Sequence, residues 1–148
     1  MVLIYKSISV RFVGMGCPNK RILVIDDELS VRTVIARYLC RRDFQVDLAA
    51  DGEEGIRKFR LFQYDMVISD CHMPGPKITE VIKELTRLRP GIPILILSGL
   101  ADPVQVREVL KAGATSFMPK PFELADLLRT INVSVQQSAI SDQLSAFG

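Results

Sequence analysis

Five polar residues in this sequence follow short apolar runs and belong to types that could together carry out phosphoryl chemistry. They are Asp26, Asp27, Asp70, Ser98 and Lys120. Clustered carboxylates repel one another and need a cation, and oxygen ligands favour a hard ion such as Mg²⁺. An aspartate can attack a phosphoryl group to form an acyl phosphate, and a metal ion, a lysine and a hydroxyl stabilise the charge on the transferred group. The five residues are therefore candidates for one site if the fold brings them together.

Each of these residues also has a simpler explanation when it is considered alone. Asp70 and Ser98, at the ends of predicted strands, fit ordinary turn positions, and Asp26 and Asp27 fit the cap of the following helix. Lys120 lies between two prolines, where exposure to solvent is the usual environment of a lysine. The functional interpretation therefore depends on a common location for all five.

The elements that would position these residues alternate along the chain. Short apolar runs predict strands, and apolar residues spaced three or four apart predict helices between them. This alternation with short connections predicts an α/β fold, a doubly wound five-stranded parallel sheet with helices on both faces. Ligands of such sheets bind at the carboxyl ends of the strands, so we expect the five polar residues on one rim. The strands are expected at 21–25, 44–48, 66–69, 93–97 and 115–118, and the helices at about 31–39, 51–59, 78–88, 103–112 and 124–135.

Two of the predicted helices carry start signals. Asp51 followed by Glu54 forms a capping box, and Asp102 followed by Pro103 combines an N-cap with a proline at the first helical position. Gly55 lies inside the helix that Asp51 begins. Because glycine costs about 1 kcal/mol relative to alanine inside a helix, we expect this helix to be a weak element.

The composition is that of an ordinary globular protein. The chain has 148 residues, 48% of them hydrophobic, and this length favours one domain. Its net charge of +2 is too small to indicate nucleic-acid or membrane binding. Three cysteines without a CxxC pair and a single histidine argue against a Cys/His metal site or catalytic dyad and fit a reducing cytoplasm. No apolar run approaches the roughly 20 residues that a membrane helix needs.

The sequence divides into three parts. Residues 21–135 carry the regular pattern and are predicted to form the folded domain, and residues 136–148 form a polar tail that is expected to fray. Residues 1–20 form an N-terminal extension in which charged residues interrupt the apolar ones, which argues against a signal peptide. We expect this extension to be a loose segment or an additional strand, unless translation begins at Met15.

Four motifs around the predicted strand ends resemble the response-regulator receiver domain of two-component signalling, as in chemotaxis regulators. The resemblance covers about residues 20–135, and the motifs occur in the expected order and at the expected intervals. It implies the flavodoxin-like receiver fold with strand order 2-1-3-4-5. The motifs are Ile-Leu-Val-Ile-Asp-Asp-Glu at 22–28, Val-Ile-Ser-Asp-Cys-His-Met-Pro-Gly at 67–75, Ile-Leu-Ser-Gly at 96–99 and Ala-Gly-Ala-Thr-Ser-Phe-Met-Pro-Lys-Pro-Phe at 112–122.

The resemblance implies the role of each acidic residue. Asp70 occupies the position of the family's phosphoacceptor. Asp27 and Asp70 would bind Mg²⁺ directly, and Asp26 would act mostly through water. The backbone carbonyl of His72 would complete the protein ligands of the metal.

The resemblance also implies how the phosphoryl group is held and sensed. Ser98, which precedes Gly99 in its motif, matches the hydroxyl that binds the phosphoryl group, and Lys120 matches the lysine that pairs with another phosphoryl oxygen. Phe117 matches an aromatic residue that turns inward on activation, although a strand phenylalanine is by default a core residue. The bond before Pro121 matches one that is often cis in the family.

The implied function is a phosphorylation-controlled switch rather than an enzyme that turns over a metabolite. Asp70 would take a phosphoryl group from the phosphohistidine of a sensor histidine kinase or histidine phosphotransfer protein, catalysing its own phosphorylation with Mg²⁺ as cofactor. The face formed by residues 104–133 would then change its preference for a downstream protein. His72 and Leu100 occupy the two positions that tune loss of the phosphoryl group. Because the apolar Leu100 cannot orient an attacking water, we expect slow self-dephosphorylation.

The expected setting of this switch follows from the same resemblance. We expect a cytoplasmic protein that is a monomer or a phosphorylation-dependent dimer and binds neither membrane nor nucleic acid directly. No output domain is recognisable after residue 135, so the domain would act through contacts, or the chain would be a fragment of a longer regulator.

One departure from the family pattern leaves alternatives open. In the family, the motif that contains Asp70 is commonly followed by an apolar residue, then an acidic or amide residue, then a glycine. Here Pro76-Lys77-Ile78 stands in their place, so we expect a reshaped loop. An adaptor of receiver fold that works without phosphorylation is one alternative. A Mg²⁺-dependent phosphatase with an aspartate nucleophile is another, but that family has Asp-x-Asp after the first strand. A flavodoxin-like FMN binder would need a hydroxyl-rich loop where this chain has acids.

Overall fold

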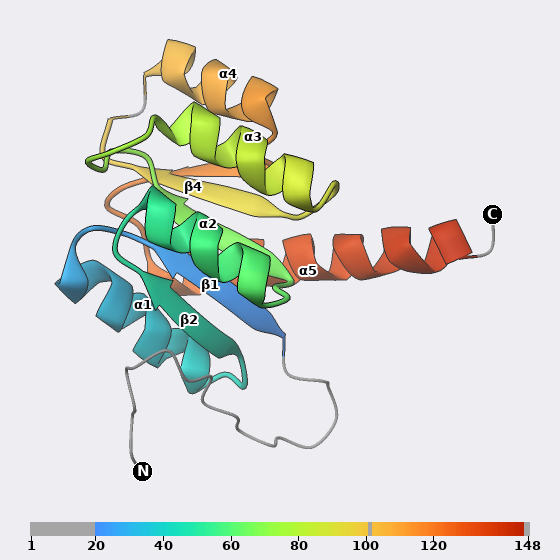
Figure 1. Cartoon of the computed structure of the whole chain (residues 1–148). Helices are drawn as coiled ribbons and strands as arrows, with labels where there is room; N and C mark the ends of the chain where they lie inside the picture. Colours follow the sequence, from blue (N-terminus) through green and yellow to red (C-terminus); the bar gives the residue numbers. More distant parts are fainter. Residues whose placement is uncertain (1–19, 101, 147–148) are drawn as a thin grey trace.

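Five strands and five helices alternate along the chain (Figure 1). The structure, a computed structural model, describes residues 20–100 and 102–146, so the predicted N-terminal extension lies outside the described residues except for Lys20. The elements are β1 (Arg21–Ile25), α1 (Leu29–Cys40), β2 (Gln45–Ala49), α2 (Gly52–Leu61), β3 (Met66–Asp70), α3 (Ile78–Leu88), β4 (Ile94–Ser98), α4 (Pro103–Ala112), β5 (Ser116–Pro119) and α5 (Leu124–Ala146).

The five strands form one sheet in the order β2-β1-β3-β4-β5, with every neighbouring pair parallel. This arrangement confirms the predicted doubly wound fold and its strand order. The sequence placed β2, β4 and β5 one residue too early, because a short apolar run does not define its own ends. Among the described residues, no helix has the length and apolar character needed to span a membrane.

The sheet is covered on both faces, because successive side chains of a strand point to opposite sides. On one face, residues such as Ile22 and Ile68 pack with Leu39 of α1 and Ile131 of α5. On the other face, residues such as Leu23 pack against α2, α3 and α4. The central strands β1, β3 and β4 are therefore buried on both sides, as continuous apolar sequences predict. The edge strands β2 and β5 are more exposed.

The cap of α2 explains why this helix begins where the sequence indicated. The Asp51 carboxylate accepts a hydrogen bond of 2.8 Å from the Glu54 N–H, and Glu54 accepts one of 2.8 Å from the N–H of Ala50. Gly55 has a packing role, since a Cβ atom there would lie 2.4 Å from Cδ1 of Ile25. The glycine lets α2 approach β1 closely, which gives it a packing role that the sequence does not predict.

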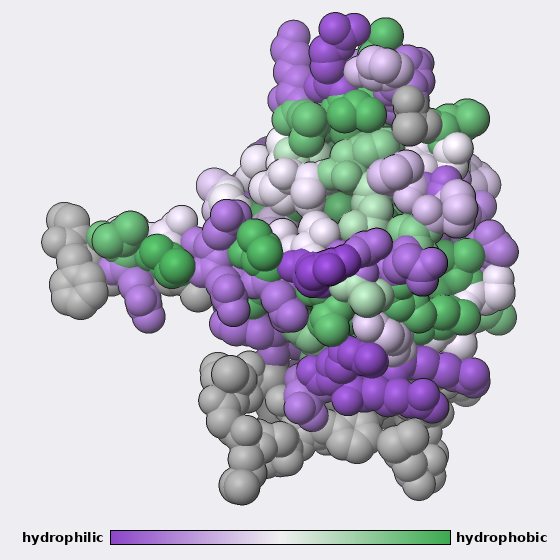
Figure 2. Space-filling view, turned by 180° about the vertical axis from the view of Figure 1, so that it is seen from behind, coloured by the Kyte–Doolittle hydropathy of each residue, from purple (hydrophilic) through white to green (hydrophobic). Residues whose placement is uncertain are grey.

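Helix α5 continues to Ala146, where the sequence predicted a frayed tail after Val135. Residues 136–146 contain neither proline nor glycine, so nothing in them stops a helix. Serine hydroxyls there also bond within the helix, as Ser141 does to the Gln137 carbonyl at 3.0 Å. The projecting part of α5 extends past the sheet and carries a mixture of hydrophilic and hydrophobic side chains (Figures 1 and 2).

Candidate functional site

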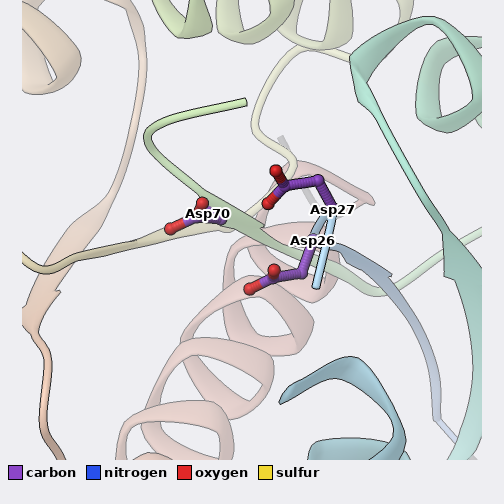
Figure 3. Close-up of side chains that lie close together, drawn as sticks. All are labelled: Asp26, Asp27 and Asp70. Carbon is purple, nitrogen blue, oxygen red and sulfur yellow. The ribbon is translucent and has the colours of Figure 1, made fainter. Parts of the chain in front are cut away.

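The ends of β1 and β3 bring the acidic residues together. Ile25 pairs with Ser69 in the parallel register of these strands, so the residues that follow, Asp26 and Asp70, lie level with each other. Both side chains are buried, at 1% and 7% exposure, whereas Asp27 is exposed. Figure 3 shows the three carboxylates gathered at this rim, two from the end of β1 and one from β3.

The three carboxylates form a group that could hold a metal ion. Asp26, Asp27 and Asp70 each offer an oxygen atom, and these atoms all lie within 4.8 Å of one another. Mg²⁺ prefers oxygen ligands and keeps several waters, which suits a set in which Asp27 faces solvent. The donor set of this rim therefore fits Mg²⁺.

Lys120 supplies the cation that partly balances this charge. Its Nζ atom lies 2.9 Å from Oδ1 of Asp70 and 3.4 Å from Oδ2 of Asp26. Burial alone would lower the pKa of Lys120, but the hydrogen bond to Asp70 and the charges of both carboxylates outweigh it and raise that pKa. One ammonium group facing three carboxylates leaves the rim acidic, as a divalent cation site requires.

Asp26 is the least solvated of the three acids. Burial raises its pKa and the charge of Asp70 acts in the same direction, while the N–H of Glu28 and the Lys120 ammonium oppose them. The Glu28 N–H donates to Oδ1 of Asp26 at 2.9 Å, which leaves Oδ2 facing Lys120. The Asp26 side chain therefore faces the site and also bonds the residue before α1. The N-cap of α1 is Glu28, without a side-chain cap hydrogen bond, so the capping interpretation of Asp26 and Asp27 was wrong.

Ser98 lies at the end of β4 with its side chain fully buried. Its Oγ atom accepts from the Leu100 N–H at 3.1 Å and can donate to the Leu100 carbonyl at 3.1 Å or to Oε1 of Gln105 at 3.4 Å. Nε2 of Gln105 lies 3.0 Å from Nε2 of His72. The Ser98 hydroxyl is thus connected through α4 to the loop after β3.

Gln105 lies beside the site, and its sequence context does not predict this. The signal for it was weak, since a polar residue in the first turn of a helix is usually solvated surface. Only its position in the first helix after Ser98 set it apart. Gln105 is half-buried, and its two amide atoms face two different predicted site residues.

The other predicted positions surround this rim. Phe117 is half-buried on β5, where it pairs with Ile96 and packs on the face of the sheet covered by α3 and α4. Gly99 follows β4 directly, and a Cβ atom there would meet nothing within 4 Å. The peptide bond between Lys120 and Pro121 is cis.

The loop after Asp70 contains a glycine with positive φ and leads into α3. Gly75 has a φ of 102°, a conformation that favours glycine. Lys77 is the N-cap of α3 and makes no side-chain cap hydrogen bond, because an ammonium group cannot accept one. A cavity of about 640 Å³ separates this loop from α4, and His72 and Gln105 both line it.

Two further buried groups lie outside this chemistry. Burial, followed by the charge of Asp70, raises the pKa of the Cys71 thiol, which keeps it protonated and unreactive. Asp47 is buried in the middle of β2, where it pairs with Arg21 at 2.6 Å and accepts from the Tyr64 hydroxyl at 2.6 Å. These contacts give Asp47 a structural role.

Comparison with solved structures supports the fold. The receiver domain protein (CheY-like) of Methanospirillum hungatei JF-1 superposes with a TM-score of 0.81 at 27% identity, covering 84% of this chain and 99% of that one. Chemotaxis protein CheY4 of Vibrio cholerae gives a TM-score of 0.75 at 30% identity and covers 79% of this chain and 99% of that one.

Sequence comparison points to the same family. Chemotaxis protein CheY of Thermotoga maritima is 29% identical over 115 residues, which are 77% of this chain and 96% of that protein. Response regulator MprA of Mycobacterium ulcerans is 34% identical over 127 residues, which are 85% of this chain but 54% of MprA. The chain thus spans about half the length of several curated relatives. A family model described as the response regulator receiver domain matches residues 22–132. Together with the parallel sheet and the acidic rim, this match shows that the chain belongs to the receiver domain family of two-component response regulators.

Proposed function

We propose that Asp70 is the phosphoacceptor of this receiver domain and takes a phosphoryl group from a phosphohistidine. The observation that carries the proposal is the environment of the Asp70 carboxylate. Two further carboxylates lie within 4.8 Å, and the Lys120 ammonium lies 2.9 Å away. A single acid surrounded in this way can be both a metal ligand and a nucleophile.

The metal ligands of the proposed site are Asp27 and Asp70, with Asp26 acting mostly through water and the His72 backbone carbonyl completing the set. Bound Mg²⁺ would offset the charge of the phosphoryl oxygens. Because Asp26 is buried and already bonded to the N–H of Glu28, it suits an outer position, whereas the exposed Asp27 can bind a hydrated ion.

In the proposed transfer, a carboxylate oxygen of Asp70 forms a bond to phosphorus while the phosphorus–nitrogen bond of the phosphohistidine breaks. The electron pair of that bond returns to the imidazole. The other ring nitrogen of the phosphohistidine carries a proton, so the ring leaves as neutral imidazole. Lys120 stabilises one oxygen of the transferred group, and the Ser98 hydroxyl donates to another. The product is an acyl phosphate on Asp70.

The output of the proposed switch is a change in protein contacts. Receiver domains exchange signals between histidine kinases and downstream effectors, and we assign the output face here to residues 104–133, including Phe117. Exposed Arg107 and Lys111 lie on α4 within this face. A downstream protein binds this face of a monomer or of a phosphorylation-dependent dimer, without direct contact to nucleic acid.

Intact-protein mass spectrometry after incubation with phosphoramidate and Mg²⁺ tests the proposal. We expect an adduct of one phosphoryl group that is absent in Asp70→Asn and without the metal. An absence of adduct with phosphoramidate, acetyl phosphate and a phosphohistidine donor would favour a phosphorylation-independent adaptor. Continuous release of phosphate over many turnovers would favour a phosphatase.

A further inference from the structure

A chain of hydrogen bonds crosses from the end of β4 through α4 to the loop after β3. Ser98 Oγ lies 3.4 Å from Oε1 of Gln105, and Nε2 of Gln105 lies 3.0 Å from Nε2 of His72. Gln105 is in the first turn of α4, whereas the other two residues follow strands that meet at the acidic rim. The Gln105 side chain therefore links two segments of the site across the cavity that separates them.

The Ser98 hydroxyl cannot serve all of its neighbours at once. A hydroxyl has one proton to donate, and the Leu100 N–H already bonds to its oxygen at 3.1 Å. The proton can therefore go either to the Leu100 carbonyl or to Oε1 of Gln105. A phosphoryl oxygen on Asp70 that took this proton would remove it from Gln105.

The other end of the Gln105 amide defines the state of His72. With Oε1 facing Ser98, the amide nitrogen is the donor, so Nε2 of His72 accepts and the neutral imidazole carries its proton on Nδ1. His72 is exposed, so water can replace this bond when it breaks. The link to His72 connects α4 with the loop after β3.

We propose that Gln105 is a positioning residue that couples α4 to the phosphoryl state of Asp70. It holds the Ser98 hydroxyl and the His72 loop in the unphosphorylated arrangement, and competition for the Ser98 proton releases it. This inference rests on the proposed function of Asp70, but its hydrogen bonds exist without phosphorylation. It assigns a role to a residue outside the acidic rim.

The direction of the effect follows from the competition for the Ser98 proton. Gln105→Leu removes a contact that a phosphoryl group on Asp70 would otherwise have to break, so binding of the phosphoryl group or a mimic becomes relatively more favourable. A neutral hydrogen bond is worth enough to change an equilibrium by roughly two- to tenfold. By linkage, any ligand that favours the phosphorylated arrangement gains the same factor in affinity.

The imidazole tautomer tests the bonds without phosphorylation. His72 is the only histidine of the chain, so its ring nitrogens are assigned directly in a proton–nitrogen NMR spectrum recorded above the pH range of histidine titration. We expect the Nδ1-protonated tautomer in the wild-type protein and a shift to the Nε2-protonated tautomer in Gln105→Leu. The same tautomer in both proteins would overturn the proposed arrangement.

Beryllofluoride, a phosphoryl mimic, tests the coupling in the presence of Mg²⁺. Its affinity is measured for the wild-type protein, Gln105→Leu, Ser98→Ala and the double variant. Leu61→Ala is the control, because that exposed side chain lies on α2, outside the site and the output face. We expect roughly two- to tenfold tighter binding in Gln105→Leu, no change in Leu61→Ala, and loss of the Gln105 effect when Ser98 is absent.

The outcomes separate this inference from the proposed function. Binding to the wild-type protein with unchanged affinity in Gln105→Leu would overturn the coupling role alone, and so would an equal effect with and without Ser98. A wild-type protein that takes neither beryllofluoride nor a phosphoryl group would overturn the proposed function and the coupling with it, whatever the imidazole tautomer shows.

Discussion

The Nζ atom of Lys120 lies 2.9 Å from Oδ1 of Asp70, although 50 residues separate them in the chain. They meet because β3 and β5 both run parallel to β4 and end at the same rim. The ammonium group is thus at the proposed acceptor before any phosphoryl group arrives. Its second contact, with Asp26 at 3.4 Å, means that it also balances the charge of the most buried carboxylate.

Replacing this lysine should destabilise the metal-free protein. Lys120→Met leaves two buried carboxylates without their cation, which we expect to lower the free energy of unfolding by about 1–3 kcal/mol in urea titrations. Mg²⁺ should restore part of the loss. Lys111→Met is the control, because Lys111 is an exposed lysine of α4. Equal stability of the two variants would contradict a charge-balancing role for Lys120.

Removing a carboxylate should stabilise the metal-free protein where no bond is lost. Asp27 is exposed but close to two other acids, so we expect Asp27→Asn to raise the metal-free melting temperature by about 2–4 °C. Asp70→Asn should give a smaller rise, because it also weakens the contact with Lys120. The stabilisation by Mg²⁺ should shrink in both. A lower melting temperature of metal-free Asp27→Asn would show that the three carboxylates do not repel one another.

Much of this arrangement follows from the sequence, because apolar runs and helical spacing define the element order and parallel strands bring their ends together. What the sequence could not show depends on contacts between elements. In the sequence, Gly55 predicted a weak helix, whereas in the structure it lets α2 lie close to Ile25 of β1. Gln105 lacked any local signal, since its partners come from two other segments. The continuation of α5 was missed because exposed polar residues give no apolar pattern whether or not they are helical.

Leu100 should make the acyl phosphate long-lived. Its side chain is 66% exposed and has no group that could orient a water molecule, so we expect the phosphoryl group to be lost more slowly than in Leu100→Glu. A carboxylate there should speed the loss of the phosphoryl group by at least about tenfold. This factor lies below the usual range for complete general-base catalysis. Mass spectrometry after removal of the donor measures both rates, with Leu100→Gln as the uncharged control. A wild-type half-life of seconds that Leu100→Glu leaves unchanged would contradict the prediction.

Glu84 should make stability depend on pH at low pH. Hydrogen bonds from Arg87 and Arg60 lower its pKa to about 2. A lowered carboxyl pKa contributes stability that is fully present above the ordinary value of 4.5 and is lost as pH falls towards 2. We therefore expect Glu84→Gln to melt slightly below the wild-type protein near neutral pH, and the difference to vanish at the acid end. Salt should also reduce it, because the group is exposed to screening.

Glu80→Gln is the matched control for this prediction, since Glu80 is an exposed acid of the same helix. It should show a smaller difference from the wild-type protein at neutral pH. A Glu84→Gln difference that persists unchanged down to pH 2 would mean that the charge of Glu84 is not its cause.

The projecting part of α5 should be dispensable for the stability of the domain. Val135 is the last residue of α5 in the core cluster, and residues 136, 137 and 140–145 are exposed. Ending the chain after Gln137 should therefore lower the helical signal in circular dichroism but change the free energy of unfolding by less than about 1 kcal/mol, within the range of surface changes. Ending it after Ile131 is the contrasting variant, because that removes Val135 from the core and should cost about 1–3 kcal/mol for the lost burial. A large loss of stability in the longer variant would show that residues 138–148 pack on the domain.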